Sequence, residues 1–205
     1  AFDDNNGDPL AKLYLVHDAD AVYARFEVRD PTPMENRAEL LPLLFKKGDA
    51  VGLYFGKAGE RREAQAGDIR FLATRVDGKD VLQAMAPVSE TLDKPFRYKS
   101  PVGDETFAYV GPVEGGAVKI DVQNNRYVVD LKLPKAFFEG LDFAAGSELA
   151  FEAEVLLSGY GQRGFQAISR NHLYTSRAAT QAKMVDDIPS EARLSPANWG
   201  VLRVE

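Results

Sequence analysis

The chain has 205 residues, of which 45% are hydrophobic and 27% charged, and it contains no cysteine. A disulfide-stapled scaffold, a cysteine zinc site and a cysteine nucleophile are therefore excluded, while the apolar content suffices for one substantial core. With 25 basic and 31 acidic residues the net charge is -6, so the chain lacks the basic excess typical of nucleic-acid binding. No apolar stretch approaches the ~20 residues of a membrane-spanning helix.

Apolar and polar residues alternate with a period of two along the whole chain, and this pattern predicts strands with one buried and one wet face. The clearest examples are Val22 to Arg29 and the last run, where Glu152 and Glu154 separate apolar residues. In chain order the predicted strands cover residues 22–29, 51–55, 69–73, 118–122, 127–133 and 149–157. Their number indicates a strand-rich protein.

Turn residues lie between these runs. The pair Asn124-Asn125 predicts a hairpin between the strands 118–122 and 127–133. Pro134 and Gly140 bracket one short helical piece. We therefore expect an all-β fold, an antiparallel β-sandwich of Greek-key or jelly-roll type with long loops and one short helix, forming a single domain over residues 1–205.

Two stretches are irregular, residues 30–47 with three prolines and residues 158–198 with many small and polar side chains. Long loops on a sandwich commonly carry ligand sites. The strand faces between them predict one core shared by two sheets, made of Val22, Phe26, Val51, Phe55, Phe71, Val129, Leu131, Phe151 and Val155. Truncating Phe151 is expected to cost about 3 to 5 kcal/mol, the usual penalty for a buried aromatic residue.

Several segments resemble the bacterial family 9 carbohydrate-binding modules, within the broader DOMON-like superfamily. They are LVHDADAVYARFEVRDPTPMEN (Leu15 to Asn36), KKGDAVGLYFG, GDIRFLAT, LKLPKAFFEGLDFAAGSELAFEAEVLLS and DDIPSEARLSPANWG. The resemblance covers nearly the whole chain and implies a β-sandwich module of a secreted multidomain protein. Members bind sugars, often with structural calcium, and related branches hold haem b for electron transfer.

The resemblance implies a sugar site made of an aromatic clamp, an arginine, a carboxylate and amides. Arg70 stands at the position of the sugar-bonding arginine, Glu154 at that of an amide, and Phe45 near the first clamp tryptophan. Gly52 replaces a glutamate of the family pattern. Asn171 and Tyr174 fall near the second clamp.

The strand pattern itself adds two expectations. Tyr54 lies on the polar phase of its strand and is a candidate sugar platform. Arg70 also lies on the polar phase, so it is expected to project from the sheet into solvent, where its planar fork suits vicinal hydroxyls or a carboxylate. The alternative is that Arg70 pairs with Glu154 or another acid across the strands. Trp199 is expected to pack the last strand against the sheet.

A second group of residues could bind a metal ion or haem. Asp30 and Asn36 flank PTPM and could hold Ca²⁺ or brace the loop, while Asp3 to Asp8 forms an acidic segment without EF-hand spacing. His17 or His172 with Met34, Met85 or Met184 could ligate haem b.

No catalytic motif is present, so we expect a non-catalytic domain. The expected partners are a glycan or sugar terminus and the neighbouring domains of a larger, extracellular or periplasmic bacterial protein. The other functional hypotheses are a haem b electron-transfer domain and a structural module without a ligand.

Overall fold

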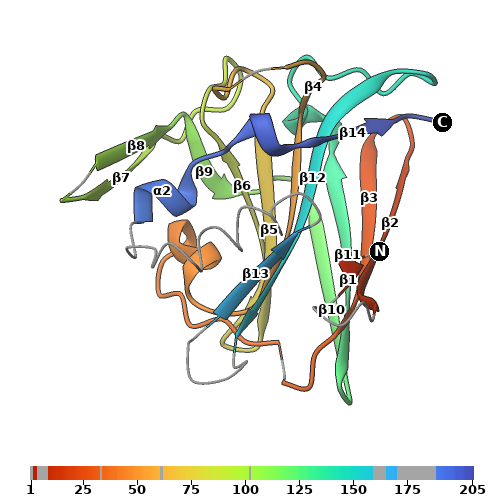
Figure 1. Cartoon of the computed structure of the whole chain (residues 1–205), viewed down its shortest axis with the longest axis vertical. Coiled ribbons are helices and arrows are strands. Elements are labelled where there is room, and N and C mark those ends of the chain that lie inside the picture. Colours follow the sequence, from red (N-terminus) through yellow and green to blue (C-terminus); the bar gives the residue numbers. More distant parts are fainter. Residues whose placement is uncertain are drawn as a thin grey trace.

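The computed structural model describes residues 2–3, 9–32, 34–60, 62–101, 103–158, 165–169 and 188–205. Their strands form two large antiparallel sheets and one separate hairpin (Figure 1). The first sheet has five strands in the order β1-β2-β3-β11-β10. Its members are β1 (Phe2–Asp3), β2 (Pro9–His17), β3 (Ala21–Arg29), β10 (Ala117–Gln123) and β11 (Arg126–Pro134).

The second sheet has seven strands, six of them in the order β13-β12-β4-β5-β6-β9, with β14 pairing with β12. Its members are β4 (Ala50–Lys57), β5 (Ile69–Val76), β6 (Lys79–Ala86), β9 (Tyr109–Pro112), β12 (Glu148–Ser158), β13 (Phe165–Ser169) and β14 (Gly200–Arg203). The pairs β3–β11 and β4–β12 join strands that are distant in the chain. This arrangement confirms the predicted all-β antiparallel sandwich.

The individual elements follow the sequence pattern closely. The predicted hairpin is β10–β11, in which Ile120 pairs with Val129, and Asn125 in its turn has a φ of 59°. Asparagine tolerates this left-handed conformation better than most residues, which explains its place there. The predicted short helix is a single 3₁₀ turn, η2 (Lys135–Phe137).

One hydrophobic core fills the space between the two sheets, and it contains the predicted residues. Phe26, Phe55 and Phe71 are fully buried in it. Phe151 packs against this core but is only half-buried, with its ring centroid 5.1 Å from that of Phe55. The membership of Phe151 in the shared core is confirmed, and the cost of truncating it is expected to be smaller than that of a fully enclosed ring.

A second buried cluster lies on the other face of the seven-stranded sheet, which the sequence had suggested would be wet. It includes Tyr54, Leu72 and Met85 from the sheet itself. The cover consists of the 3₁₀ helix η1 (Leu41–Lys46), the hairpin β7 (Phe96–Ser100) with β8 (Gly103–Phe107), the helix α2 (Ile188–Ala192) and the turn η4 (Pro196–Asn198). Strands β4 and β5 are consequently buried on both faces.

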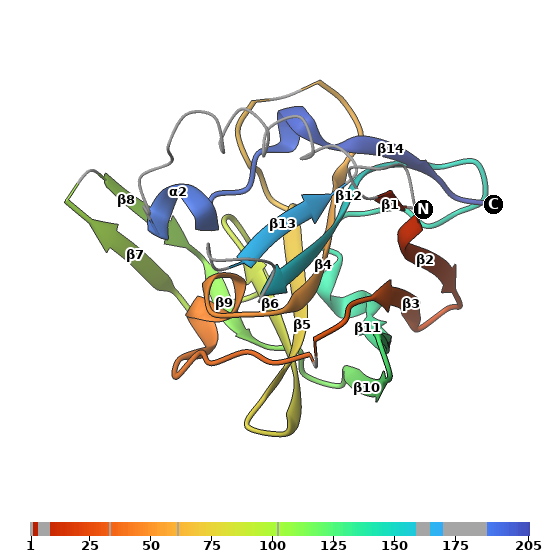
Figure 2. The same ribbon diagram turned by 60° about the horizontal axis from the view of Figure 1, so that its bottom comes forward.

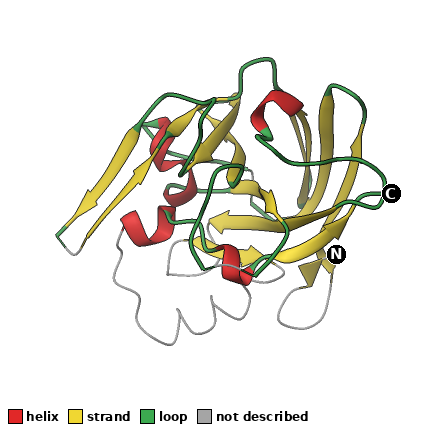
Figure 3. Cartoon of the chain, turned by 90° about the horizontal axis from the view of Figure 1, so that it is seen from above, coloured by secondary structure: helices red, strands yellow, loops and turns green. Residues whose placement is uncertain are grey.

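The elements of this cover lie together in space although they are far apart in the sequence. Helix α2 lies beside the β7–β8 hairpin, as both views show (Figures 1 and 2). The hairpin projects from the edge of the molecule, and helical turns lie next to it when the chain is seen from above (Figure 3). This layer decides how accessible the candidate site is.

Candidate functional site

Arg70 lies on β5, in the middle of the seven-stranded sheet, and it is buried. Its neighbours Ile69 and Phe71 face the shared core, so the Arg70 side chain extends from the opposite face. Only 3% of the residue is exposed. The prediction that Arg70 projects into solvent is therefore wrong, because the second cluster covers this face of the sheet.

The partner of Arg70 is Glu154 on β12. The Nε and Nη2 atoms of Arg70 both donate to Oε1 of Glu154, at 2.8 and 2.6 Å. The two side chains are 4% and 7% exposed. The pairing that the sequence offered as an alternative is thus present, but as a buried ion pair. Removing one partner alone from such a pair strongly destabilises the protein, because the other charge stays buried.

Two aromatic rings lie close to the guanidinium group of Arg70. Its Cζ lies 5.3 Å from the ring centroid of Phe45, on η1, and 5.1 Å from that of Tyr54, on β4. These distances are within the range of cation–π contacts. The ring of the half-buried Trp199 lies 5.6 Å from that of Tyr54, tilted by 49° against it. The sequence expectations for Phe45, Tyr54 and Arg70 converge on this place, although Tyr54 is buried rather than exposed.

Burial and charge act on the ionisable groups in opposite directions. Burial is the largest influence on Arg70 and works to lower its pKa, but the attraction and hydrogen bonding of Glu154 together with the influence of Tyr54 and Tyr98 outweigh it, and the pKa lies above the ordinary value. Burial raises the pKa of the Tyr54 hydroxyl well above its usual range; the charge of Arg70 opposes this rise, and that of Glu154 adds to it. The site therefore holds a charged arginine and a neutral tyrosine at physiological pH.

Gln83 is a buried amide on the same face of the sheet. It lies on β6, where it pairs with Leu72 of β5. Arg70, on the same strand as Leu72, pairs with Met85 of β6. Gln83 is fully buried, and among the described residues neither its Oε1 nor its Nε2 has a hydrogen-bond partner. A buried polar group without a partner costs about 1–3 kcal/mol. Nothing in the sequence around Gln83 indicates that its amide is buried.

We expect Gln83→Leu to raise the free energy of unfolding by about 1–3 kcal/mol, because it removes two polar atoms that burial leaves unbonded. Urea denaturation measures the change. Thr74→Val is the matched control on the neighbouring strand, since the Thr74 hydroxyl donates to the carbonyl of Asp49 and its loss should destabilise by about 0.5–1.5 kcal/mol. A destabilised Gln83→Leu variant would show that the amide is bonded after all.

Hydrogen bonds and ion pairs hold the cover over the site. The Tyr98 hydroxyl on β7 donates to the carbonyl of Pro42 in η1, at 2.8 Å. Lys46 at the end of η1 pairs with Glu191 of α2, with 2.9 Å between Nζ and Oε1. The side chains of this second pair are 10% and 19% exposed. These contacts join η1 to the hairpin and to α2.

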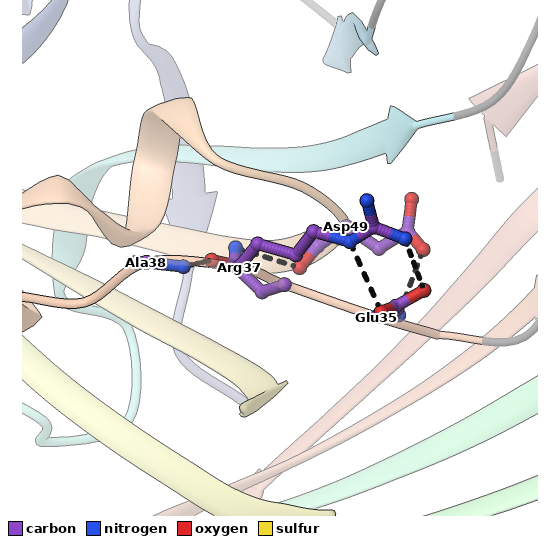
Figure 4. A network of polar contacts seen from close by, with 5 residues as sticks. Glu35, Arg37, Ala38 and Asp49 are labelled. Atoms are coloured by element: carbon purple, nitrogen blue, oxygen red, sulfur yellow. Dashed lines mark hydrogen bonds and ion pairs between the residues drawn. The ribbon is translucent and has the colours of Figure 1, made fainter. Parts of the chain in front are cut away.

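Asn36 braces the loop between β3 and β4. Its Nδ2 donates to the carbonyls of Leu44 and Asp49, at 2.8 and 3.2 Å, and its Oδ1 accepts from the amide of Ala38 at 3.0 Å. Figure 4 shows the surroundings, where the amide of Glu35 donates to the carboxylate of Asp49. All polar atoms of the Asn36 side chain are engaged by the backbone. Its role in this structure is loop bracing.

Asp30, the other candidate calcium ligand, is also buried in this loop. Its Oδ1 accepts from the amide and the hydroxyl of Thr32, at 2.8 and 2.7 Å. Its Oδ2 has no hydrogen-bond partner among the described residues. Calcium binding by Asp30 and Asn36 stays a prediction. In the described part of the chain no group of three or more His, Cys, Asp or Glu residues could hold a metal ion.

The haem candidates that lie within the described residues are in different parts of the fold. His17 is exposed beside Phe143, whereas Met34 and Met85 are buried in the two different apolar clusters. His172 and Met184 lie outside the described residues, as do the predicted sugar ligands Asn171 and Tyr174 and the acidic segment 4–8.

No helix in the described ranges is long and apolar enough to cross a membrane. A groove of about 360 Å³ lies away from Arg70, where β2, β3 and the β10–β11 turn meet. Apolar residues such as Leu10 and Val28 line it together with charged residues such as Glu27 and Arg126.

Comparison with known proteins bears on the fold of the chain. No protein-family model matches the chain, and no curated protein matches it in sequence. A family 9 carbohydrate-binding module from Caldicellulosiruptor kristjanssonii, solved with glucose, is similar in structure with a TM-score of 0.51 and 16% identity, covering 95% of this chain and 76% of that chain. Its complex with cellotriose gives a TM-score of 0.52 and 18% identity over 94% and 73%.

The chain therefore has the β-sandwich fold of the family 9 carbohydrate-binding modules. The resemblance seen in the sequence is confirmed at the level of the fold. Membership of the DOMON-like superfamily stays a prediction.

Proposed function

We propose that this domain binds a carbohydrate at the covered face of the seven-stranded sheet, around Arg70 and Glu154. The observation that carries the proposal is the buried Arg70–Glu154 pair, whose guanidinium group lies close to the rings of Phe45 and Tyr54. The fold adds support, since structural neighbours were solved with glucose and cellotriose. A terminal glucose unit, free or in a β-glucan, is the first ligand to test.

The chemistry of the pair suits sugar hydroxyls. A guanidinium group presents several donors in one plane, and a carboxylate accepts from hydroxyl groups in short, charge-assisted hydrogen bonds. Both donors of Arg70 in this pair go to a single oxygen of Glu154, so its second oxygen is not used by Arg70. The flanking rings offer apolar surface to the faces of a sugar ring.

Access to this site requires movement of the cover. The side chains of Arg70 and Glu154 are 4% and 7% exposed, so a sugar reaches them only in a conformation in which η1 or α2 has shifted. When the competent conformation is a small fraction, the apparent affinity falls by that fraction. We therefore expect weak binding, which calls for ligand concentrations in the millimolar range.

Isothermal titration with glucose, cellotriose and a panel of other sugars should show saturable binding to the native chain. Binding should disappear in the double variant Arg70→Met/Glu154→Leu. This variant is expected to remain folded, because apolar side chains of similar volume often replace a buried ion pair without loss of stability. The control is Arg25→Gln/Asp130→Asn, which removes an exposed ion pair on the five-stranded sheet and should leave binding unchanged. A native chain that binds no sugar in the panel would contradict the proposal.

A ligand-free structural module is the second candidate, and the burial of the pair favours it. In that case Arg70 and Glu154 only hold β5, β4 and β12 in register beneath the cover. The double variant would again stay folded, because apolar side chains can replace a buried ion pair, but no sugar would bind to either protein. The titration above separates the two functions.

The remaining proposals concern context. We propose a non-catalytic module of a larger exported bacterial protein, in an extracellular or periplasmic setting. Calcium and haem b stay predictions, to be tested by the change of melting temperature on Ca²⁺ addition and by a Soret band.

A further inference from the structure

The two charged residues of the candidate site are not on neighbouring strands. Glu154 on β12 stands opposite Gly52 on β4, and Arg70 on β5 stands opposite Tyr54 on β4. Strand β4 therefore lies between the two partners. Since adjacent strands are about 4.7–4.9 Å apart, the backbones of β12 and β5 are separated by about 10 Å. The ion pair forms only because both side chains extend over β4.

Gly52 is the point at which the Glu154 side chain crosses β4. A Cβ atom at position 52 would lie 2.3 Å from Oε1, 2.6 Å from Cγ and 2.9 Å from Cδ of Glu154. All three distances are shorter than real Cβ contacts, and they involve the carboxylate together with the stem that carries it. Any side chain at position 52 would thus displace Glu154 from Arg70.

The backbone does not require glycine here. Gly52 is absent from the positive-φ glycines of the described chain, and its conformation in the middle of β4 is open to any residue. Glycine inside a strand weakens the strand and often marks a close approach by another group. The missing side chain, rather than the flexible backbone, is what the structure uses at position 52.

We infer that Gly52 is a positioning residue of the Arg70 site, and that positions 52 and 154 share one volume. The carboxylate that pairs with Arg70 can come from position 154 on β12, as it does here, or from an acidic side chain at position 52 on β4. The two positions exclude each other, because a side chain at position 52 displaces Glu154. The pairing itself is independent of ligand. Its effect on sugar binding rests on the proposed function.

The first test is a double-mutant cycle of Gly52→Ala and Glu154→Ala, followed by urea denaturation. Gly52→Ala alone should raise the unfolding equilibrium constant roughly 10- to 100-fold, since it separates a buried pair. In the Glu154→Ala background the added methyl group meets no carboxylate, so the same change should alter the constant by less than about 3-fold. Equal effects of Gly52→Ala in both backgrounds would overturn the inference.

The second test moves the carboxylate between strands, in Gly52→Glu/Glu154→Ala. The readout is the NMR signal of the Arg70 Nε–H, which is protected and shifted when it donates to a carboxylate. We expect the signal in the native chain, its loss in Gly52→Ala and Glu154→Ala, and its return in the relocated variant. An unchanged signal in Gly52→Ala would overturn the inference, and the cycle above decides it should the relocated variant fail to fold.

Sugar affinity is the third readout, and it separates this inference from the proposed function. If the native chain binds sugar, the relocated variant should recover at least about a tenth of the native association constant, while Gly52→Ala loses binding. A native chain without sugar affinity contradicts the proposed function only. The NMR signal and the cycle then decide the coupling between positions 52 and 154.

Discussion

Replacing Arg70 by alanine should lower the free energy of unfolding by about 3–5 kcal/mol, although the residue lies on the polar phase of its strand. The reason is the partner, because Glu154 would remain beneath the cover with an uncompensated charge. Urea denaturation at neutral pH measures the loss. The effect far exceeds the ~0.5 kcal/mol typical of an exposed side chain on a sheet face.

Arg25→Ala is the matched comparison for this result. Arg25 also donates through two nitrogens to one acid, from Nε to Oδ1 and from Nη2 to Oδ2 of Asp130 at 2.6 and 2.9 Å, but the two side chains are 54% and 41% exposed. An exposed pair contributes about 0–1 kcal/mol, so this variant should be nearly as stable as the native chain. A loss below about 1 kcal/mol for Arg70→Ala as well would contradict the burial of the Arg70 pair.

The other large effect is expected at Phe71, for which alanine should cost about 3–5 kcal/mol. Its side chain is fully buried, and its ring lies 6.3 Å from that of Phe55 and 5.3 Å from that of Phe138. Truncation leaves a cavity between the two sheets that these rings cannot fill without moving. Thermal or chemical denaturation measures the cost.

Phe151→Ala provides the internal comparison, since Phe151 contacts the same core from a half-buried position. Its truncation should cost less than that of Phe71, about 1–2 kcal/mol, because part of the ring already faces solvent. A larger loss for Phe151 than for Phe71 would mean that the centre of the core lies nearer to β12 than the structure places it.

The sequence predicts the first core well because its signal is local. Alternation along β3, β11 and β12 places Phe26, Val129 and Val155 on one face of each strand, and the structure buries all three between the sheets. The hairpin turn at Asn125 is equally local. Both depend on contacts that the strand period and the turn residues determine directly.

The second cluster could not be predicted in the same way. Its cover comes from residues 41–46, 96–107 and 188–199, which are brought together only by the tertiary fold. One signal was available, since Tyr54, Leu72 and Met85 occupy positions that a wet face would fill with polar residues. The sequence offers the pairing of Arg70 with Glu154, 84 residues away, as one alternative, but it shows neither that the pair is buried nor that it crosses Gly52.

The position of the ligand site is tested most directly by following the Arg70 Nε–H signal while glucose or cellotriose is added to the native chain. Our account predicts a saturable shift of this signal, with the same dissociation constant that calorimetry gives for the whole domain. A sugar that binds while the Arg70 signal stays unchanged would place the site elsewhere on the sandwich, and it would contradict the role proposed for the Arg70–Glu154 pair.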